Sequence, residues 1–147
     1  MNDNERADLI HRALACAVAK DAEGAADALS AVGENSDNWQ MYGTCCAIAA
    51  MAVEVMTRHL GMAFDSAGGD MMVIEPLLPG ATFRSPAEAF SMRFIVAYAN
   101  GDKDTALALY KAAGEAGPGQ FTESVSSLLA DAAGITRLAL DQQQTGH

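Results

Sequence analysis

Basic residues are scarce in this sequence, and nowhere are they clustered. The 147 residues include 19 Asp and Glu but 9 Lys and Arg, which gives a formal net charge of −10. A protein that neutralises nucleic acid phosphates or anionic lipid headgroups needs grouped cations. We therefore expect neither direct nucleic acid binding nor membrane binding. The acid excess is greatest over residues 1–40, where its simplest role is to keep that face of the protein solvated.

A long uninterrupted apolar run is also missing. The longest apolar region, residues 41–64, is broken by Glu54, Arg58 and His59. A membrane span needs about 20 predominantly apolar residues with few charges, so this region is more typical of a buried helix. Glu54 and Arg58 stand four residues apart in the favourable order, and we interpret them as an ion pair on the helix surface.

Metal-ligating residues are few and badly spaced. Cys45 and Cys46 would point about 100° apart on a helix, and His59 follows about four turns later. No Cys-x-x-Cys or His-x-x-x-His spacing occurs. We therefore predict no metal site and no cofactor, and interpret His59 as a core histidine or a helix-end residue. With Cys16 the cysteines are odd in number, which is typical of unpaired thiols in a reducing cytoplasm.

Signatures of catalysis are absent as well. The sequence contains no Gly-x-Ser-x-Gly elbow and no glycine-rich phosphate loop. A catalytic carboxylate needs a partner group and a desolvated pocket, and no pattern of residues points to such a pair. We expect a protein that is not an enzyme.

Alanine, by contrast, is abundant, and half of the residues are apolar. Alanine is the best helix former, and β-branched residues are few, so we predict an all-α, bundle-type single domain over residues 1–141. Apolar spacing and capping signals predict six helices. Their approximate ranges are 4–20, 23–32, 38–63, 86–100, 103–114 and 120–141. The third helix is the longest and is apolar nearly all round, so we expect it at the centre of the bundle.

The sequence also carries signs of an internal duplication. A shift of 81 residues places Asp102 on Asp21 and Gly114 on Gly33, at corresponding turns. The predicted helices then match in order, which favours two related three-helix halves packed face to face. The halves are residues 4–63 and 85–141, joined by a linker, 64–84, and followed by a disordered tail, 142–147.

One segment carries residues of a known repeat. The aromatic, turn, small and proline positions of a tetratricopeptide helical hairpin are matched by Phe90, Gly101-Asp102, Ala106, Tyr110, Ala113 and Pro118. Residues 87–118 therefore resemble that family, although Arg93 and Phe94 stand where it has a leucine and a small residue. The resemblance implies a protein-interaction role. The outward residues of the first helix, near Glu88, Ser91 and Tyr98, would then contact a peptide.

The linker is the second candidate for a contact surface. Its apolar residues are costly to leave in water, and its methionine pair suits an adaptable contact. The candidates are Met71, Met72, Ile74, Leu77, Leu78 and Phe83, with Tyr98 nearby. We predict a small interaction module, an adaptor or regulator. It would bind another protein, or a second copy of itself, through an apolar groove with an acidic rim.

Two other functions stay open. Alanine-rich helices leave room for a cavity, so the bundle could carry or sense a small apolar ligand, with the linker as its lid. Alternatively, the acidic residues 1–40 could occupy the basic groove of a nucleic-acid-binding protein and inhibit it by charge mimicry.

Overall fold

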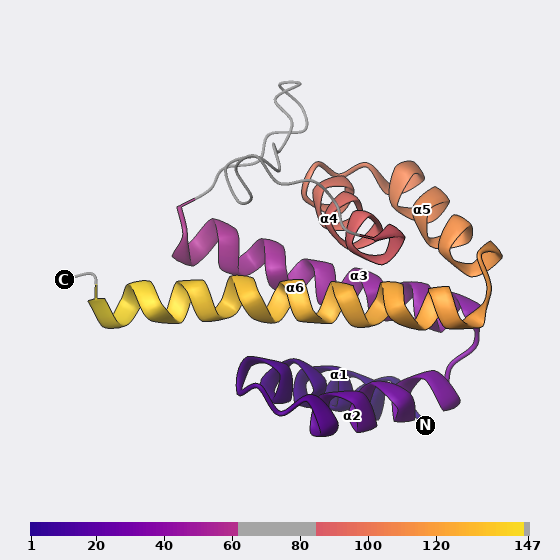
Figure 1. The fold of residues 1–147 in the computed structure, drawn as a ribbon, viewed down its shortest axis with the longest axis horizontal. Coiled ribbons are helices and arrows are strands. Elements are labelled where there is room, and N and C mark those ends of the chain that lie inside the picture. Colours follow the sequence, from indigo (N-terminus) through magenta and orange to yellow (C-terminus); the bar gives the residue numbers. More distant parts are fainter. Residues whose placement is uncertain (62–84, 146–147) are drawn as a thin grey trace.

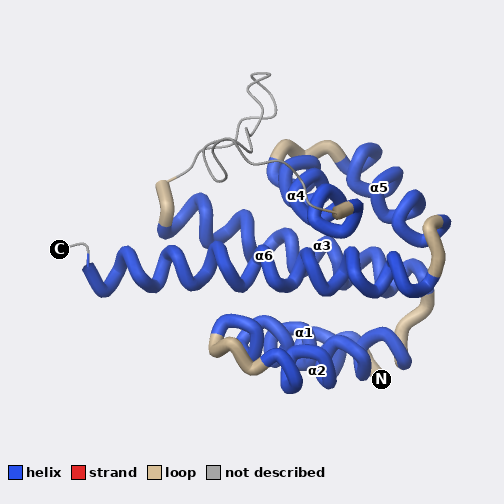
Figure 2. Tube along the Cα trace, in the orientation of Figure 1, coloured by secondary structure: helices blue, strands red, loops and turns tan. Residues whose placement is uncertain are grey.

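A computed structural model describes residues 1–61 and 85–145 of the chain, and within these residues the chain folds into six helices. The helices are α1 (Asp3–Val18), α2 (Ala22–Glu34), α3 (Asn38–His59), α4 (Pro86–Ala99), α5 (Lys103–Glu115) and α6 (Pro118–Thr145). The described part of the chain contains no strand (Figure 2). The all-α prediction is confirmed. The linker candidates Met71, Met72, Ile74, Leu77, Leu78 and Phe83 lie outside the described residues.

Side-chain caps fix where the helices begin. Asp37 accepts a bond from the Gln40 amide at 2.8 Å, and the Gln40 side chain accepts one from the Asp37 amide at 2.9 Å. This reciprocal capping box starts α3 at the predicted place. Ser85 likewise accepts from the Glu88 amide, and Pro86 occupies the first turn of α4.

The two long helices form the middle of the molecule. Figure 1 shows α3 and α6 side by side and running in the same direction, with the α1–α2 hairpin on one side and the α4–α5 hairpin on the other. The first helix of each hairpin, α1 or α4, packs against both long helices. Each hairpin therefore rests on a long helix from the other half of the chain.

The core follows from this arrangement, with one correction to the prediction. On α3, Ile48, Ala52 and Met56 are fully buried and belong to one hydrophobic core with Phe94 and Leu128 of the other half. The longest helix, however, is α6 with 28 residues, and it packs against α1, α3, α4 and α5. It shares the central position with α3, because its small buried residues let other helices approach from several sides.

The C-terminal end of α6 also departs from the prediction. The helix continues to Thr145, so the disordered tail does not begin at residue 142. The Gln143 side-chain amide lies 3.0 Å from Nδ1 of His59, the last residue of α3. His59 is exposed, which makes it a helix-end residue and corrects the core interpretation.

The two hairpins share one turn. Their second helices, α2 and α5, are separated by 81 residues at both ends. In the first hairpin the amides of Lys20 and Asp21 donate to the carbonyls of Ala17 and Cys16. In the second hairpin the amides at the corresponding positions, Gly101 and Asp102, donate to the carbonyls of Tyr98 and Ala97. Lys20 and Gly101 both adopt a left-handed backbone, with φ of 64° and 71°. This correspondence supports related halves, and the duplication itself stays a prediction.

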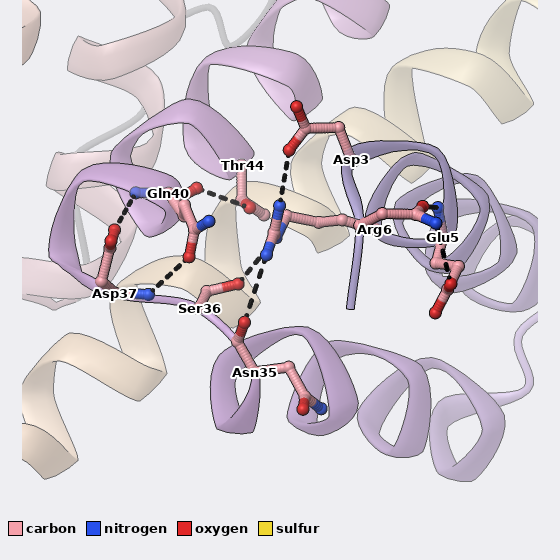
Figure 3. Close-up of polar contacts among 9 residues, drawn as sticks. Asp3, Glu5, Arg6, Asn35, Ser36, Asp37, Gln40 and Thr44 are labelled. Carbon is pink, nitrogen blue, oxygen red and sulfur yellow. Dashed lines mark hydrogen bonds and ion pairs between the residues drawn. The ribbon is translucent and has the colours of Figure 1, made fainter.

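Arg6 ties α1 to the start of α3, a role that its place outside the apolar stripe did not predict. Its side chain is 6% exposed, and it donates to Ser36 Oγ at 2.9 Å, to the Asn35 carbonyl at 3.1 Å and to Asp3 Oδ1 at 3.0 Å. Figure 3 shows the guanidinium reaching the loop between α2 and α3, beside the capping box. These contacts satisfy the buried guanidinium, so this cluster is structural.

Candidate binding groove

An open groove of about 450 Å³ lies between the α1–α2 hairpin and α6. Its size falls within the range of small-molecule sites, roughly 300–1,000 Å³. Short apolar side chains form most of its walls. The hairpin contributes Ala17, Ala22, Ala25, Ala26 and Leu29, and α6 contributes Ser126, Leu129, Ala130 and Ala133. We call this feature the hairpin groove.

The walls of the hairpin groove carry small residues at positions where the second half of the chain has larger ones. Under the 81-residue shift, Leu29 corresponds to Tyr110, Ala17 to Tyr98 and Ala26 to Leu107. The Tyr110 ring is 5% exposed, lies 5.4 Å from the Tyr42 ring and donates its hydroxyl to Asn38 at the start of α3. Aromatic packing thus fills the corresponding space between α5 and α3.

Two cations line one end of the hairpin groove, on residues Lys20 and Arg137. Arg137 Nη1 donates to the Ala17 carbonyl at 2.9 Å, and the Lys20 amide donates to the same oxygen at 3.1 Å. The end of α1 therefore holds both residues together. Neither forms an ion pair with any residue in the described ranges.

The backbone of Lys20 is strained, since a side chain at φ 64° crowds its own carbonyl. A residue other than glycine loses about 1 kcal/mol or more there, whereas Gly101 holds the same conformation in the other half without that penalty. The counterpart of Arg137 is Met56, which is uncharged. The charged end is therefore particular to the first half, and the groove has no acidic residue among those that line it.

The residues predicted on the first helix of the tetratricopeptide-like hairpin do not lie at the hairpin groove. Glu88 is half-buried on α4, and Tyr98 is 36% exposed near the end of that helix. Ser91 is fully buried and bonds to an Asp131 carboxylate oxygen on α6. The expectation that Ser91 faces outward is wrong, because α4 packs against both long helices and has less free surface than the resemblance implies.

Ser91 and Asp131 are placed for packing and not for catalysis. Burial raises the pKa of Asp131, the hydrogen bond from Ser91 opposes that rise, and Glu88 adds to it. A nucleophilic serine needs a base and an open path to its substrate. Ser91 has no exposed surface in this structure.

The thiols of α3 are equally inert. Burial raises the pKa of Cys45 to about 12 and also raises the pKa of Cys46. Both sulfurs therefore stay protonated near neutral pH, whereas the thiolate is the nucleophile and the metal ligand. Cys16, Cys45 and Cys46 all have free thiols.

Comparison with family models, with curated proteins and with solved structures gives no match to this chain. Within the described residues, every helix is too short or too polar to cross a membrane. Sequence reasoning missed the hairpin groove and its two cations. The signal was present in the alignment of the two halves at a shift of 81 residues. Ala17, Ala26 and Leu29 align with larger residues of the second half, and Lys20 aligns with Gly101.

Proposed function

We propose that this protein is a non-enzymatic carrier or sensor, and that the hairpin groove takes the apolar part of a small molecule. The observation that carries the proposal is the groove itself, with Leu29 and Ala26 in its walls at positions where the second half has the larger Tyr110 and Leu107. The walls offer an aliphatic chain about 0.8 kcal/mol for each methylene group that leaves water. A chain of several carbons would bind with useful affinity on this basis.

A neutral fluorescent probe tests the proposal. N-phenyl-1-naphthylamine brightens in apolar surroundings, and we expect saturable binding by the wild-type protein. The variant Ala26→Leu with Leu29→Tyr copies the second half and fills the groove, so it should weaken probe binding at least about tenfold. Circular dichroism checks that the helices remain.

The matched control adds the same leucine elsewhere. Ala108→Leu lies on an exposed position of α5, away from the hairpin groove, and should bind the probe like the wild type. Unsaturable probe binding by the wild type, or unchanged binding by the filled variant, would show that the hairpin groove does not take apolar ligands.

A second candidate function is protein interaction, and Trp39 favours it. Its side chain is 71% exposed at the start of α3, beside the Tyr42 ring at 5.6 Å. Exposed tryptophan is enriched among residues that dominate protein interfaces. We propose self-association through Trp39 and through the linker residues Met71 and Leu77, with the tetratricopeptide-like hairpin as a further contact.

Sedimentation equilibrium over a range of concentrations tests self-association. A dimer that dissociates in Trp39→Ala, or in Met71→Asp with Leu77→Asp, supports the second candidate. A wild-type protein that stays monomeric throughout the range removes self-association from consideration.

We also propose that the protein works in the cytoplasm. The support is that all three thiols are free, including the adjacent pair Cys45 and Cys46. A reducing compartment keeps such thiols unpaired. Fractionation of cells that express the full chain tests this placement.

A further inference from the structure

We propose that the ligand of the hairpin groove is an aliphatic carboxylate, whose tail lies along the alanine walls and whose head group binds Lys20 and Arg137. This inference rests on the function proposed above and names the chemistry of the ligand. It depends on three observations about the charged end of the groove: its sign, its geometry and its absence from the other half.

The sign of the charge runs against that of the whole protein. The chain carries a formal net charge of −10, yet the charged residues that line the hairpin groove are the cations Lys20 and Arg137. Within the described part of the chain, neither has an acidic partner. An apolar trough lined at one end by two cations complements a ligand with an apolar tail and an anionic head.

The geometry brings the Arg137 guanidinium to the turn that carries Lys20. Both residues bond to the carbonyl oxygen of Ala17, through Arg137 Nη1 and the Lys20 amide. A guanidinium has five N–H donors, and the bond to Ala17 uses one of them. The remaining donors suit a carboxylate, which arginine binds as a two-pronged acceptor. The partial burial of Arg137 strengthens such a bond, because the surroundings are less polar than water.

The comparison of the halves argues against a purely structural role for Lys20. The same turn forms in the second half with Gly101, which adopts the left-handed backbone without strain. Lysine contributes nothing that this turn requires, and its backbone amide bond would form equally well with glycine. An observed strain of this kind supports a functional role for the side chain.

The test compares two ligands that share a tail and differ in charge. Titration calorimetry at pH 7 with octanoate and with 1-octanol separates the contribution of the head group from that of the tail. We expect the wild-type protein to bind octanoate about tenfold more tightly than octanol, since a charge-assisted hydrogen bond contributes a factor of that order. Added salt should weaken octanoate binding and leave octanol binding unchanged.

The variants copy the second half of the chain. Lys20→Gly and Arg137→Met introduce the residues found at Gly101 and Met56, and both should reduce octanoate affinity to that of octanol. Lys20→Gly also relieves strain, so a folding defect cannot explain its loss of affinity. Lys111→Ala removes an exposed lysine of α5 that does not line the groove, and should bind both ligands like the wild type.

The outcomes separate this inference from the proposed function. Equal binding of octanoate and octanol by the wild type would overturn the carboxylate inference while leaving an apolar site in place. Binding of neither would overturn both. Octanoate binding that survives Ala26→Leu with Leu29→Tyr would place the ligand elsewhere and overturn the inference. A wild-type dimer dissociated by the same double variant, without binding of either ligand, would assign the groove to a second copy of the chain.

Discussion

Cys16 and Gly24 meet across the first hairpin so closely that a Cβ on Gly24 would lie 2.9 Å from Cys16 Sγ. In the second half, the larger and the smaller residue of this pair stand at the opposite positions. Ala97 corresponds to Cys16 and Thr105 to Gly24, and the Thr105 amide bonds to the cap residue Asp102 at 3.1 Å. The first hairpin thus pairs a cysteine with a glycine, and the second pairs the smaller alanine with the larger threonine.

We expect Gly24→Ala to destabilise the protein by about 1–3 kcal/mol, because the new methyl group overpacks the site. In the Cys16→Ala background the same substitution should cost less, since the clash with the sulfur is gone and only the clash with Asp21 Oδ2, 2.5 Å from the new Cβ, remains. Urea denaturation of the four proteins in this double-mutant cycle gives the coupling free energy. Additive effects would show that Cys16 does not limit the space at Gly24.

Arg6→Ala should lower the free energy of unfolding by about 2–3 kcal/mol, because it removes the bonds of a buried guanidinium to Ser36, Asn35 and Asp3. Thermal and urea denaturation measure the loss. Arg12→Ala, on an exposed position of the same helix, is the matched control and should change stability by less than about 0.5 kcal/mol. Equal losses in the two variants would contradict the role assigned to Arg6.

Because of Asp131, the free energy of unfolding should decrease as the pH rises through the pKa that this carboxyl group has in the folded protein. Burial raises that pKa above the ordinary 3.8, so between the two values the folded state binds more protons than the unfolded state. Asp131→Asn cannot ionise and keeps an acceptor for Ser91. Its stability relative to the wild type should therefore increase from pH 3.5 upward and then level off. Denaturation across this pH range, with Asp27→Asn as an exposed control, measures the difference. A relative stability that decreased with pH would contradict the raised pKa.

Cys45 should resist alkylation in the folded protein. Its side chain is fully buried, and burial raises its pKa to about 12, so almost no thiolate forms at pH 8. Iodoacetamide labelling followed by peptide mass spectrometry should modify Cys45 only at the rate of unfolding. The half-buried Cys16 gives the internal comparison. Rapid labelling of Cys45 in native buffer would show that α3 opens on that timescale.

The helices could be predicted because residues close in sequence to each helix start act as its caps. Asp37 with Gln40, and Ser85 with Pro86, act within a few residues of each helix start. Arg6 could not be predicted in the same way. Its burial depends on acceptors at Asn35 and Ser36, about thirty residues further along the chain. Helical periodicity sorts residues by face and carries no information about such distant partners.

The hairpin groove was only partly open to prediction. The reduced size of Leu29 and Ala26 relative to Tyr110 and Leu107 was visible in the aligned halves. The convergence of Lys20 and Arg137 on the Ala17 carbonyl was not, because α6 approaches the first hairpin only in the assembled fold. Ser91 was misjudged for the same reason, since a hairpin considered alone gives no sign that α6 covers α4.

The packing of each hairpin against a long helix of the other half determines what would happen if the chain were cut in two. Since α1 packs against α6, and α4 packs against α3 as well as α6, neither set of three helices has a complete interior by itself. Cleaving the polypeptide between residues 61 and 85 would sever the covalent link and leave each fragment dependent on the other. Co-expressed fragments would then be complementary subunits of one heterodimer.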